Sequence, residues 1–372
     1  MDAVLVMHGI AKKLRVQVIM GIIVGIALTG SLWTLDTAGR HSPPPVRPIP
    51  PHGSGFATSL VELSQFSLDK RLEEMRATGA TWVRSDLSWS AVQEAGPASY
   101  KWQAYDRVVE SANAHGLQTL FIIGFTPSWA RPSNCTDSEM CAPASAAAYG
   151  TFAGAAAAHF APVGVHSWEI WNEANISFRF HPGVDAKKYT DMLKNAYRSI
   201  NAVDSSADII AGGTAPSASD VQNLSPVDFL QALYDNGAQG YFTAVSSHPY
   251  TYPKTPDNSG PLDAWGQLNR MHEIMAAAGD GGKQIWLTEF GAPTNGPVNR
   301  PNEYVSEALQ NQILTEAVAQ WKKHSWSGPF FWYDYKDSGS SNSSSEHFFG
   351  LVRADGSRKP AYDVFIHSAS QL

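Results

Sequence analysis

Ser167-Trp168-Glu169-Ile170-Trp171-Asn172-Glu173-Ala174-Asn175 begins as an apolar strand and ends in carboxylate and amide side chains. Because side chains alternate between the two faces of a strand, we expect Glu169, Trp171 and Glu173 to share one face. Glu173 would then stand at the carboxyl end of the strand. A carboxylate at the end of an apolar strand is costly unless it has a partner or a chemical task. The segment therefore predicts a strand that leads into a functional site.

A second segment has the same design, since Ile285-Trp286-Leu287-Thr288-Glu289 is apolar until it reaches Glu289. From Ser54 onward, short apolar runs alternate with longer runs of helical period, and we count eight such pairs. This alternation is typical of parallel strands joined by crossover helices. We expect strands at residues 55–60, 81–89, 118–125, 166–172, 208–213, 242–249, 284–290 and 328–335. We expect helices at residues 68–78, 105–115, 144–159, 186–203, 227–236, 268–278 and 307–324, with a last helix after Pro360.

Eight such units predict an α/β architecture, a (β/α)8 TIM barrel whose site lies at the carboxyl ends of the strands. An open doubly wound sheet is the alternative, but the first strand lacks the Gly-rich phosphate loop typical of such sheets. In the barrel, strands four and seven lie across the mouth from one another, so Glu173 and Glu289 would face each other over a substrate. Glycoside hydrolysis needs this pair: one carboxylic acid protonates the leaving oxygen, and the other attacks the anomeric carbon or activates water.

These segments resemble the clan A glycoside hydrolases, which are retaining TIM-barrel enzymes. Trp171-Asn172-Glu173 and the "WLTEFG" segment that contains Glu289 carry the resemblance, which covers the whole barrel. The segments "AGGTAPS", "VSSHPYTYP" and "FFWYDYKD" are similar to strand ends of the cellulase-like and family 39-like branch. The resemblance implies Glu173 as general acid/base and Glu289 as nucleophile. The clan motif commonly has Pro where this chain has Ala174, a change that removes no functional group.

The resemblance also implies roles for five substrate-binding residues. Asn172 corresponds to the residue that hydrogen-bonds the sugar 2-hydroxyl, and Arg84 to the residue that keeps the nucleophile ionised. Tyr250 would orient the nucleophile, while His248 would contact the substrate or the acid/base. Trp332 is similar to the strand-eight Trp that forms the floor beneath the reacting sugar.

Other candidates near the expected strand ends stay open between site residues and ordinary packing or surface residues. The aromatic candidates would stack on sugars or pack in the core; they are Trp89, Trp129, Tyr252 and Phe290. The polar candidates are Asp86, His181 and Asp334. Asp86 follows Arg84 by two residues, so we expect the two side chains to pair.

The composition excludes nucleic acid as a partner. The net charge is −7, and the 27 Lys and Arg residues are scattered rather than grouped into a basic face. The 12 Trp and 13 Tyr residues offer flat rings that suit sugar faces. We expect a poly- or oligosaccharide substrate, no cofactor, no metal and a monomer.

The N-terminus predicts export from the cytoplasm. An uncharged apolar run at residues 16–33 follows three basic residues, which is typical of a signal peptide or signal anchor. We therefore expect a targeting segment at residues 1–40, a proline-rich linker at 41–53 and the barrel domain at 54–372, outside the cytoplasm and anchored to the membrane or secreted. Cys135 and Cys141 lie in one loop of that domain, so we expect them to form a local disulfide.

The sequence therefore predicts a glycoside hydrolase of poly- or oligosaccharides, and the resemblance to clan A implies that it cleaves β-linked substrates with retention, by double displacement. Three alternatives stay open: a non-catalytic carbohydrate-binding barrel at the cell surface, a transglycosylase that uses the same two carboxylates, and a metal-dependent enzyme with Glu173, His248 and Glu289 as ligands. The glycan, and cleavage inside chains or at their ends, depend on loop shapes that the sequence does not determine.

Overall fold

The computed structural model describes residues 53–369 and 371–372 of the chain. The expected targeting segment and nearly all of the proline-rich linker lie outside these residues. Among the described residues, no helix combines the length and the apolar character needed to cross a bilayer.

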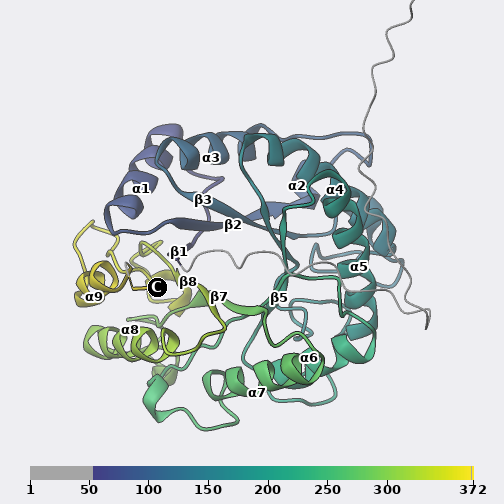
Figure 1. The fold of residues 1–372 in the computed structure, drawn as a ribbon. Coiled ribbons are helices and arrows are strands. Elements are labelled where there is room, and N and C mark those ends of the chain that lie inside the picture. The colour runs from purple at the N-terminus through teal and green to yellow at the C-terminus, as the bar shows by residue number, and fades with distance from the viewer. Residues whose placement is uncertain (1–52, 370) are drawn as a thin grey trace, which may run out of the picture. The chain divides into compact units, whose positions relative to one another are not determined.

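Eight parallel strands close into a barrel, and helices surround it (Figure 1). Closure is made by β8 against β1, with Phe331 opposite Gly55 and Trp332 opposite Phe56. The predicted (β/α)8 fold is confirmed, and the open sheet is wrong. The strands are β1 (Ser54–Ala57), β2 (Trp82–Ser88), β3 (Gln118–Gly124), β4 (Ser167–Ile170), β5 (Asp208–Thr214), β6 (Ala244–Ser247), β7 (Gln284–Phe290) and β8 (Ser327–Tyr333).

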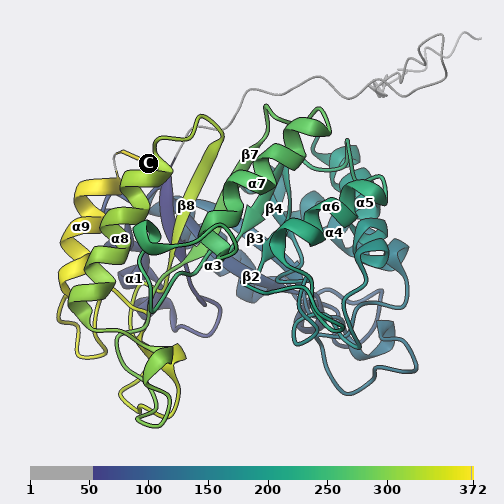
Figure 2. The same cartoon turned by 90° about the horizontal axis from the view of Figure 1, so that it is seen from below.

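The helices run along the outside of the strands, as Figure 2 shows from the side. They are α1 (Gln65–Ala77), α2 (Trp89–Val92), α3 (Gln103–Ala114), α4 (Ala146–Phe160), α5 (Ala186–Val203), α6 (Pro226–Asp235), α7 (Ala264–Ala277), α8 (Glu307–Trp321) and α9 (Pro360–Ala369). Several begin at a side chain that accepts a hydrogen bond from a backbone N–H of the first turn, which satisfies a donor that has no partner within the helix. These N-cap residues are Ser64, Ser145, Asp185, Ser225 and Ser306.

The barrel interior is filled by side chains rather than left open. Trp82 and Trp286 meet there with ring centroids 5.5 Å apart, and Phe331 packs against Trp82. Two glycines make room for the indoles, because a Cβ at Gly55 would lie 2.7 Å from the Cβ of Trp82, and one at Gly328 would lie 2.4 Å from the Trp286 ring. The interior is therefore a packed core, and the space for a ligand lies above it.

The fourth strand is shorter than predicted, since β4 ends at Ile170. Trp171 and Glu173 both have positive φ values, 64° and 54°, which extended backbone does not adopt. The prediction that Glu169, Trp171 and Glu173 share one strand face is therefore wrong. Glu169 points into the barrel interior, whereas the Trp171 ring packs against Phe180.

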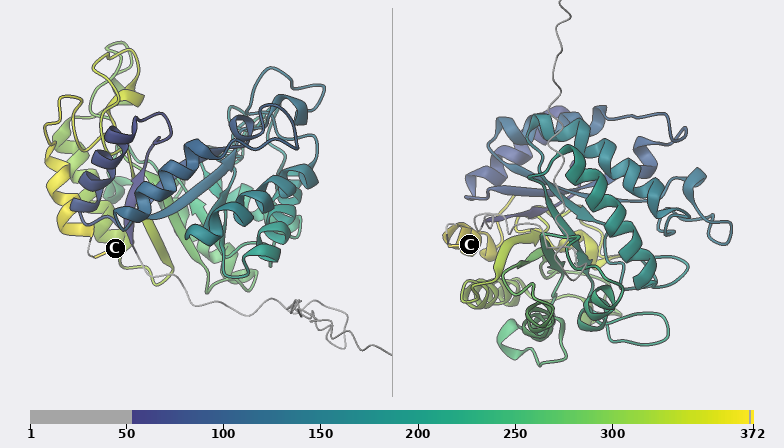
Figure 3. Two further views of the ribbon diagram at one scale, coloured as in Figure 1. Left: turned by 90° about the horizontal axis from the view of Figure 1, so that it is seen from above. Right: turned by 45° about the vertical axis from the view of Figure 1, so that its right-hand side comes forward.

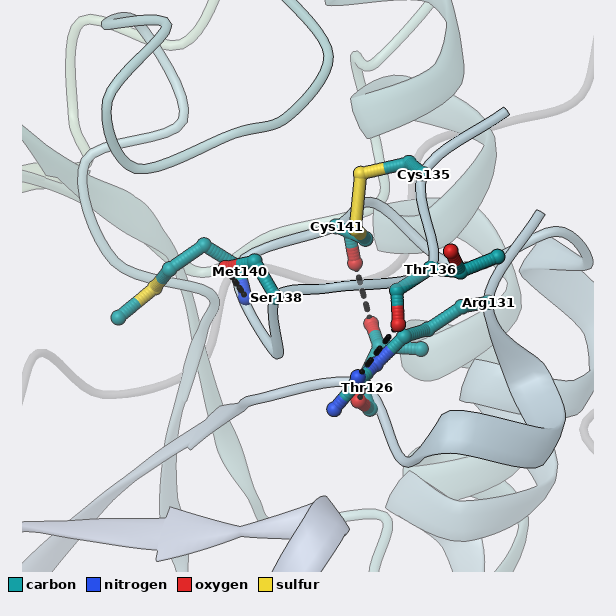
Figure 4. Close-up of a disulfide and its surroundings, with 7 residues drawn as sticks. All are labelled: Thr126, Arg131, Cys135, Thr136, Ser138, Met140 and Cys141. Carbon is teal, nitrogen blue, oxygen red and sulfur yellow. Dashed lines mark hydrogen bonds between the residues drawn. A yellow bond between two sulfur atoms is a disulfide. The ribbon is translucent and has the colours of Figure 1, made fainter. Parts of the chain in front are cut away.

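The loop between β3 and α4 contains the predicted disulfide between Cys135 and Cys141, which is confirmed (Figure 4). Hydrogen bonds tie the same loop to the end of β3, since Thr126 Oγ1 donates to the Cys141 carbonyl over 2.6 Å. Arg131 adds two more, to the carbonyls of Thr126 and Thr136. This loop forms one wall of the barrel mouth.

Candidate active site

A cavity of about 650 Å³ opens at the carboxyl ends of the strands. The loops that follow the strands gather at this end of the barrel (Figure 3). Carboxylates, a guanidinium and phenol rings line the cavity, among them Arg84, Asp86, Glu173, Tyr250 and Glu289. The cavity is therefore polar and lies where the fold is expected to place a functional site.

Glu173 and Glu289 meet in this cavity. One carboxylate oxygen of each, together with a ring nitrogen of His248, lie within 4.8 Å of one another. Glu173 is largely buried, with 8% of its surface exposed, and the Glu289 side chain is 15% exposed. The structure thus brings together the two carboxylates that the sequence singled out.

Glu289 is held as an anion. Its Oε1 accepts a hydrogen bond of 2.6 Å from Arg84 Nη1, and its Oε2 accepts one of 2.8 Å from Tyr250. Burial alone would raise the pKa of Glu289, but His248, Arg84 and the hydrogen bond from Tyr250 outweigh it and lower that pKa well below its ordinary value. An ionised carboxylate at this position has the charge state that a nucleophile needs.

Glu173 has different neighbours. Arg179 Nε lies 3.2 Å from its Oε2, and His248 Nδ1 lies 3.1 Å from its Oε1. Its backbone N–H donates to the carbonyl of Gly213 on β5, which anchors the turn after β4. Glu173 therefore lies at the cavity surface between an arginine and a histidine.

Arg84 connects the two halves of the site from its buried position on β2. Its Nε donates to Glu169 over 2.6 Å, its Nη1 donates to Glu289, and its Nη2 donates to Asn172 Oδ1 over 3.0 Å. Glu169, fully buried, also accepts from Ser246 and Thr288. The planar guanidinium suits this arrangement because its donors point in fixed, divergent directions.

Comparison with known proteins identifies the family. Residues 51–326 match the cellulase family, which is glycosyl hydrolase family 5. The chain belongs to glycosyl hydrolase family 5. It is therefore a glycoside hydrolase, and the resemblance to clan A is confirmed. No protein with a curated description matches the chain.

Several solved structures share the fold of this family 5 chain. A family 39 glycoside hydrolase from Bacteroides cellulosilyticus WH2 is 22% identical with a TM-score of 0.66, over 87% of this chain and 65% of that one. The GH39 enzyme from Xanthomonas axonopodis pv. citri is 18% identical with a TM-score of 0.64, over 89% and 70%. An endo-beta-1,4-glucanase from Xanthomonas axonopodis pv. citri is 14% identical with a TM-score of 0.61, over 86% and 100%. This chain spans less than two thirds of the first protein, and at these identities the likeness shows the fold alone.

Four of the five residues singled out for substrate binding lie at this site. Asn172 and Tyr250 line the cavity, as does Arg84. His248 is fully buried behind the two carboxylates, with Nε2 3.1 Å from Thr288 Oγ1. His248 therefore contacts Glu173, and the structure places it beneath the cavity surface.

Trp332 does not lie at the cavity. It is fully buried, its Nε1 donates to the Phe349 carbonyl over 3.1 Å, and its ring packs against Phe290. Phe331 points into the barrel interior, so strand alternation sends Trp332 to the outer face and Tyr333 inward. Tyr333 lines the cavity at the position where Trp332 was expected.

The structure divides the aromatic and polar candidates that the sequence left open into residues that line the cavity and residues that do not. Tyr252, Asp86 and Asp334 line the cavity. His181 borders a second hollow nearby, and Trp129 is partly exposed with its Nε1 donating to Gln93. The two buried packing residues are Trp89 and Phe290.

Asp86 does not pair with Arg84 as expected, because the guanidinium donates to other groups. The Asp86 side chain is exposed to the cavity, yet the walls around it remove part of its hydration and raise its pKa to about 6, against the opposing effect of the Arg84 charge. Burial likewise raises the pKa of Asp334 to about 6. These two carboxylates, and the exposed Glu346 at the cavity rim, were not assigned from the sequence.

Arg179 is a site residue that the sequence reasoning missed. It follows Glu173 by six residues on the β4–α5 loop, and no spacing rule connects a strand-end carboxylate to a loop arginine. The only available signal was its place in the same loop as the acid/base candidate.

Glu173, His248 and Glu289 have the residue types and the proximity of a metal site. However, Arg84 already neutralises Glu289 and Arg179 contacts Glu173. A cation between these carboxylates would be repelled by two guanidiniums. A second grouping, Cys135, Cys141 and His181, has both sulfurs committed to the disulfide.

Proposed function

We propose that this family 5 chain is a retaining glycoside hydrolase that acts on β-linked poly- or oligosaccharides, with Glu289 as nucleophile and Glu173 as general acid/base. The observation that carries the proposal is the proximity of the two carboxylates, since one oxygen of Glu173 lies within 4.8 Å of one oxygen of Glu289. Retaining enzymes place their carboxyl groups about 5 to 5.5 Å apart, whereas inverting enzymes need about 6.5 to 9.5 Å for a water.

In the first step, a Glu289 oxygen attacks the anomeric carbon as the bond to the leaving oxygen breaks. Glu173 gives its proton to that oxygen, so the leaving sugar departs as an alcohol and Glu289 becomes a glycosyl ester. The low pKa of Glu289 supports this role, because the attacking group must be ionised. Asn172, held by Arg84, would hydrogen-bond the sugar 2-hydroxyl.

In the second step, water attacks the same carbon while the ionised Glu173 removes its proton. The ester bond breaks, and Glu289 returns as a carboxylate still held by Arg84 and Tyr250. The tyrosine hydroxyl is bound to Oε2 and the guanidinium to Oε1, so both oxygens are oriented throughout. Two displacements at one carbon leave its configuration unchanged.

We also propose that the barrel works outside the cytoplasm. The disulfide between Cys135 and Cys141 supports this location, because such bonds persist mainly in oxidising compartments.

A non-catalytic barrel is less consistent with the site, because two arginines and a tyrosine are used to hold the carboxylates at an open cavity. A transglycosylase would use the same first step and differ only in the acceptor, so acceptor competition distinguishes it from a hydrolase.

The test is a panel of aryl glycosides and β-linked oligosaccharides with three variants. We expect Glu289→Gln to abolish hydrolysis of every substrate. Glu173→Gln should spare aryl glycosides with acidic leaving groups the most, since these need least protonation. The matched control, Glu273→Gln on the exposed face of α7, should keep full activity. Activity retained by Glu289→Gln, or lost from the wild type with a chelator, would contradict the proposal.

A further inference from the structure

A second hollow, of about 740 Å³, lies at the barrel mouth beside the catalytic cavity. No residue lines both spaces, but two loops contribute residues to each. On the β4–α5 loop, Arg179 lines the cavity and Phe178 lines the second hollow. On the β5–α6 loop, Pro216 lines the cavity and Asp220 lines the hollow. The same two loops therefore border both spaces, and the consecutive residues Phe178 and Arg179 lie between them.

Glu173, the proposed acid/base, lies on this side of the barrel mouth. Arg179 contacts Glu173 over 3.2 Å, and its guanidinium carbon lies 5.1 Å from the centroid of the Phe178 ring. The surface thus runs from Glu173 over Arg179 to Phe178. Because Glu173 protonates the leaving oxygen in the proposed mechanism, a leaving sugar would extend in this direction.

Phe178 is exposed enough to contact a ligand. The side chain is 70% exposed on a loop. The contact of a large apolar ring with water is unfavourable, so a ligand that covers the ring gains free energy. Its flat face can stack on the C–H face of a sugar. Around it, the hollow presents amide and carboxylate groups from Asn134, Asp137 and Gln222, which can hydrogen-bond hydroxyls. A ring beside such groups matches the mixed character of a saccharide.

The walls of the hollow are fixed in place. The disulfide closes the β3–α4 loop at Cys135, as Figure 4 shows. The His181 backbone then joins that loop to the β4–α5 loop through its bonds with Met140 and Ala142. Asn223 accepts from the Ser177 backbone, which joins the β5–α6 loop to the same wall. A site held this way loses little conformational entropy when a ligand binds.

We propose that this hollow binds the sugars on the leaving-group side of the scissile bond, with Phe178 as the stacking platform. The enzyme would then prefer chains that continue past the bond it cleaves. The proposal rests on the proposed function, since it takes the direction of the leaving group from the role of Glu173.

The experiment compares short and long substrates of one sugar. The probes are 4-nitrophenyl glycosides and β-linked gluco-, manno-, xylo- and galacto-oligosaccharides of two to six units, and the readout is kcat/KM. For the sugar that is hydrolysed, we expect kcat/KM to rise with chain length. Phe178→Ala should lower it about five- to tenfold for the longest chain, the size of one aromatic contact. It should leave the 4-nitrophenyl glycoside within about twofold, which also shows that Arg179 and Glu173 are undisturbed.

Two further variants complete the test. Phe178→Trp should restore the preference for long chains, and Phe66→Ala, which removes a similarly exposed ring from α1, should change nothing. Hydrolysis that is independent of chain length, or an unaltered Phe178→Ala variant, would overturn the leaving-side site while the proposed function stands. Hydrolysis of none of the probes by the folded protein would overturn both.

Discussion

Arg84 shows how one residue carries both the stability and the chemistry of the site. It is 2% exposed and donates to Glu169, Glu289 and Asn172. A lysine has a single charged nitrogen and no planar fork, so it would not make these three bonds together. The arginine therefore joins the barrel interior to the cavity surface.

Replacing Arg84 with methionine should destabilise the protein strongly. The change leaves the fully buried Glu169 without its cation, and breaking a buried pair from one side typically costs about 3 to 5 kcal/mol. Urea denaturation measures the change in the free energy of unfolding. The matched variant Arg270→Met removes an exposed pair with Glu273 and should lose at most about 1 kcal/mol. Similar losses of unfolding free energy in the two variants would show that the buried Arg84 network stabilises the protein no more than an exposed ion pair does.

Asp86 should make the folded state sensitive to pH. Its pKa in the folded protein, about 6, is above the ordinary value of 3.8, so the folded state favours the protonated form. Stability is lost as the pH rises from about 4 through 6, by an amount that solvent screening reduces because the Asp86 carboxylate is exposed to the cavity. Asp86→Asn cannot ionise, so its unfolding midpoint relative to wild type should be higher at pH 7 than at pH 4. Asp363→Asn, at an exposed site on α9, is the control. Parallel pH dependence in wild type and Asp86→Asn would refute the expectation.

At this scale the sequence predicted the residues that stand at strand ends and missed those whose place depends on tertiary structure. Glu173 and Glu289 were found at the ends of apolar runs, Asn172 and Tyr250 through the family resemblance, and all four line the cavity. The position of Trp332 was wrong because similarity of sequence does not say which face of a strand a residue occupies. Phe331 points into the barrel interior, so its neighbour Trp332 points outward. Arg179 reaches Glu173 only through the fold of its loop.

At the scale of elements, helix positions followed from the apolar period and the caps. The predicted helix at residues 186–203 coincides with α5, which begins after its Asp185 cap. The ends of strands were harder to predict than the helices. After β4, Trp171 and Glu173 have positive φ values because the chain turns there and brings Glu173 to the cavity. Nothing in the propensities of Trp171 or Glu173 favours that conformation, so the surrounding structure imposes it.

The contact between α4 and α5 depends on glycine. A Cβ at Gly150 would lie 2.7 Å from the Cβ of Asn195 and 2.8 Å from its carbonyl carbon. Gly150→Ala should therefore destabilise the barrel by about 1 to 3 kcal/mol from overpacking, despite a gain of about 1 kcal/mol in helix propensity. Gly282→Ala, whose Cβ would meet nothing within 4 Å, is the control for thermal denaturation. A more stable Gly150→Ala variant would mean that the two helices separate freely.

The disulfided loop should unfold locally before the barrel does. Cys135 and Cys141 enclose only a short segment, for which chain entropy gives about 2 kcal/mol. In the Cys135→Ser/Cys141→Ser double variant, hydrogen exchange should accelerate at the amides of residues 126–144. Exchange in β1 and β8, on the other side of the barrel, should stay slow. Uniform acceleration over the whole barrel would contradict a local role.

At the scale of the whole molecule, the site exists because the barrel closes. Glu173 and Glu289 come from β4 and β7 regions that are distant in the sequence, and only the closed order of eight strands holds them across one mouth. The eight alternating units in the sequence predicted this closure. Neither the β1 nor the β8 sequence alone indicates that these two strands pair. Closure was therefore predicted from the number of strand–helix units.

The most direct measurement traps the glycosyl ester. A 2-deoxy-2-fluoro glycoside with a dinitrophenyl leaving group, made from the sugar that the enzyme hydrolyses, slows both steps but lets the first proceed. Mass spectrometry of the digested protein should find one fluorosugar on the peptide that contains Glu289, and none in the Glu289→Gln variant. A label on another residue, or an unlabelled wild-type enzyme whose first-formed product has the inverted configuration, would contradict double displacement through Glu289.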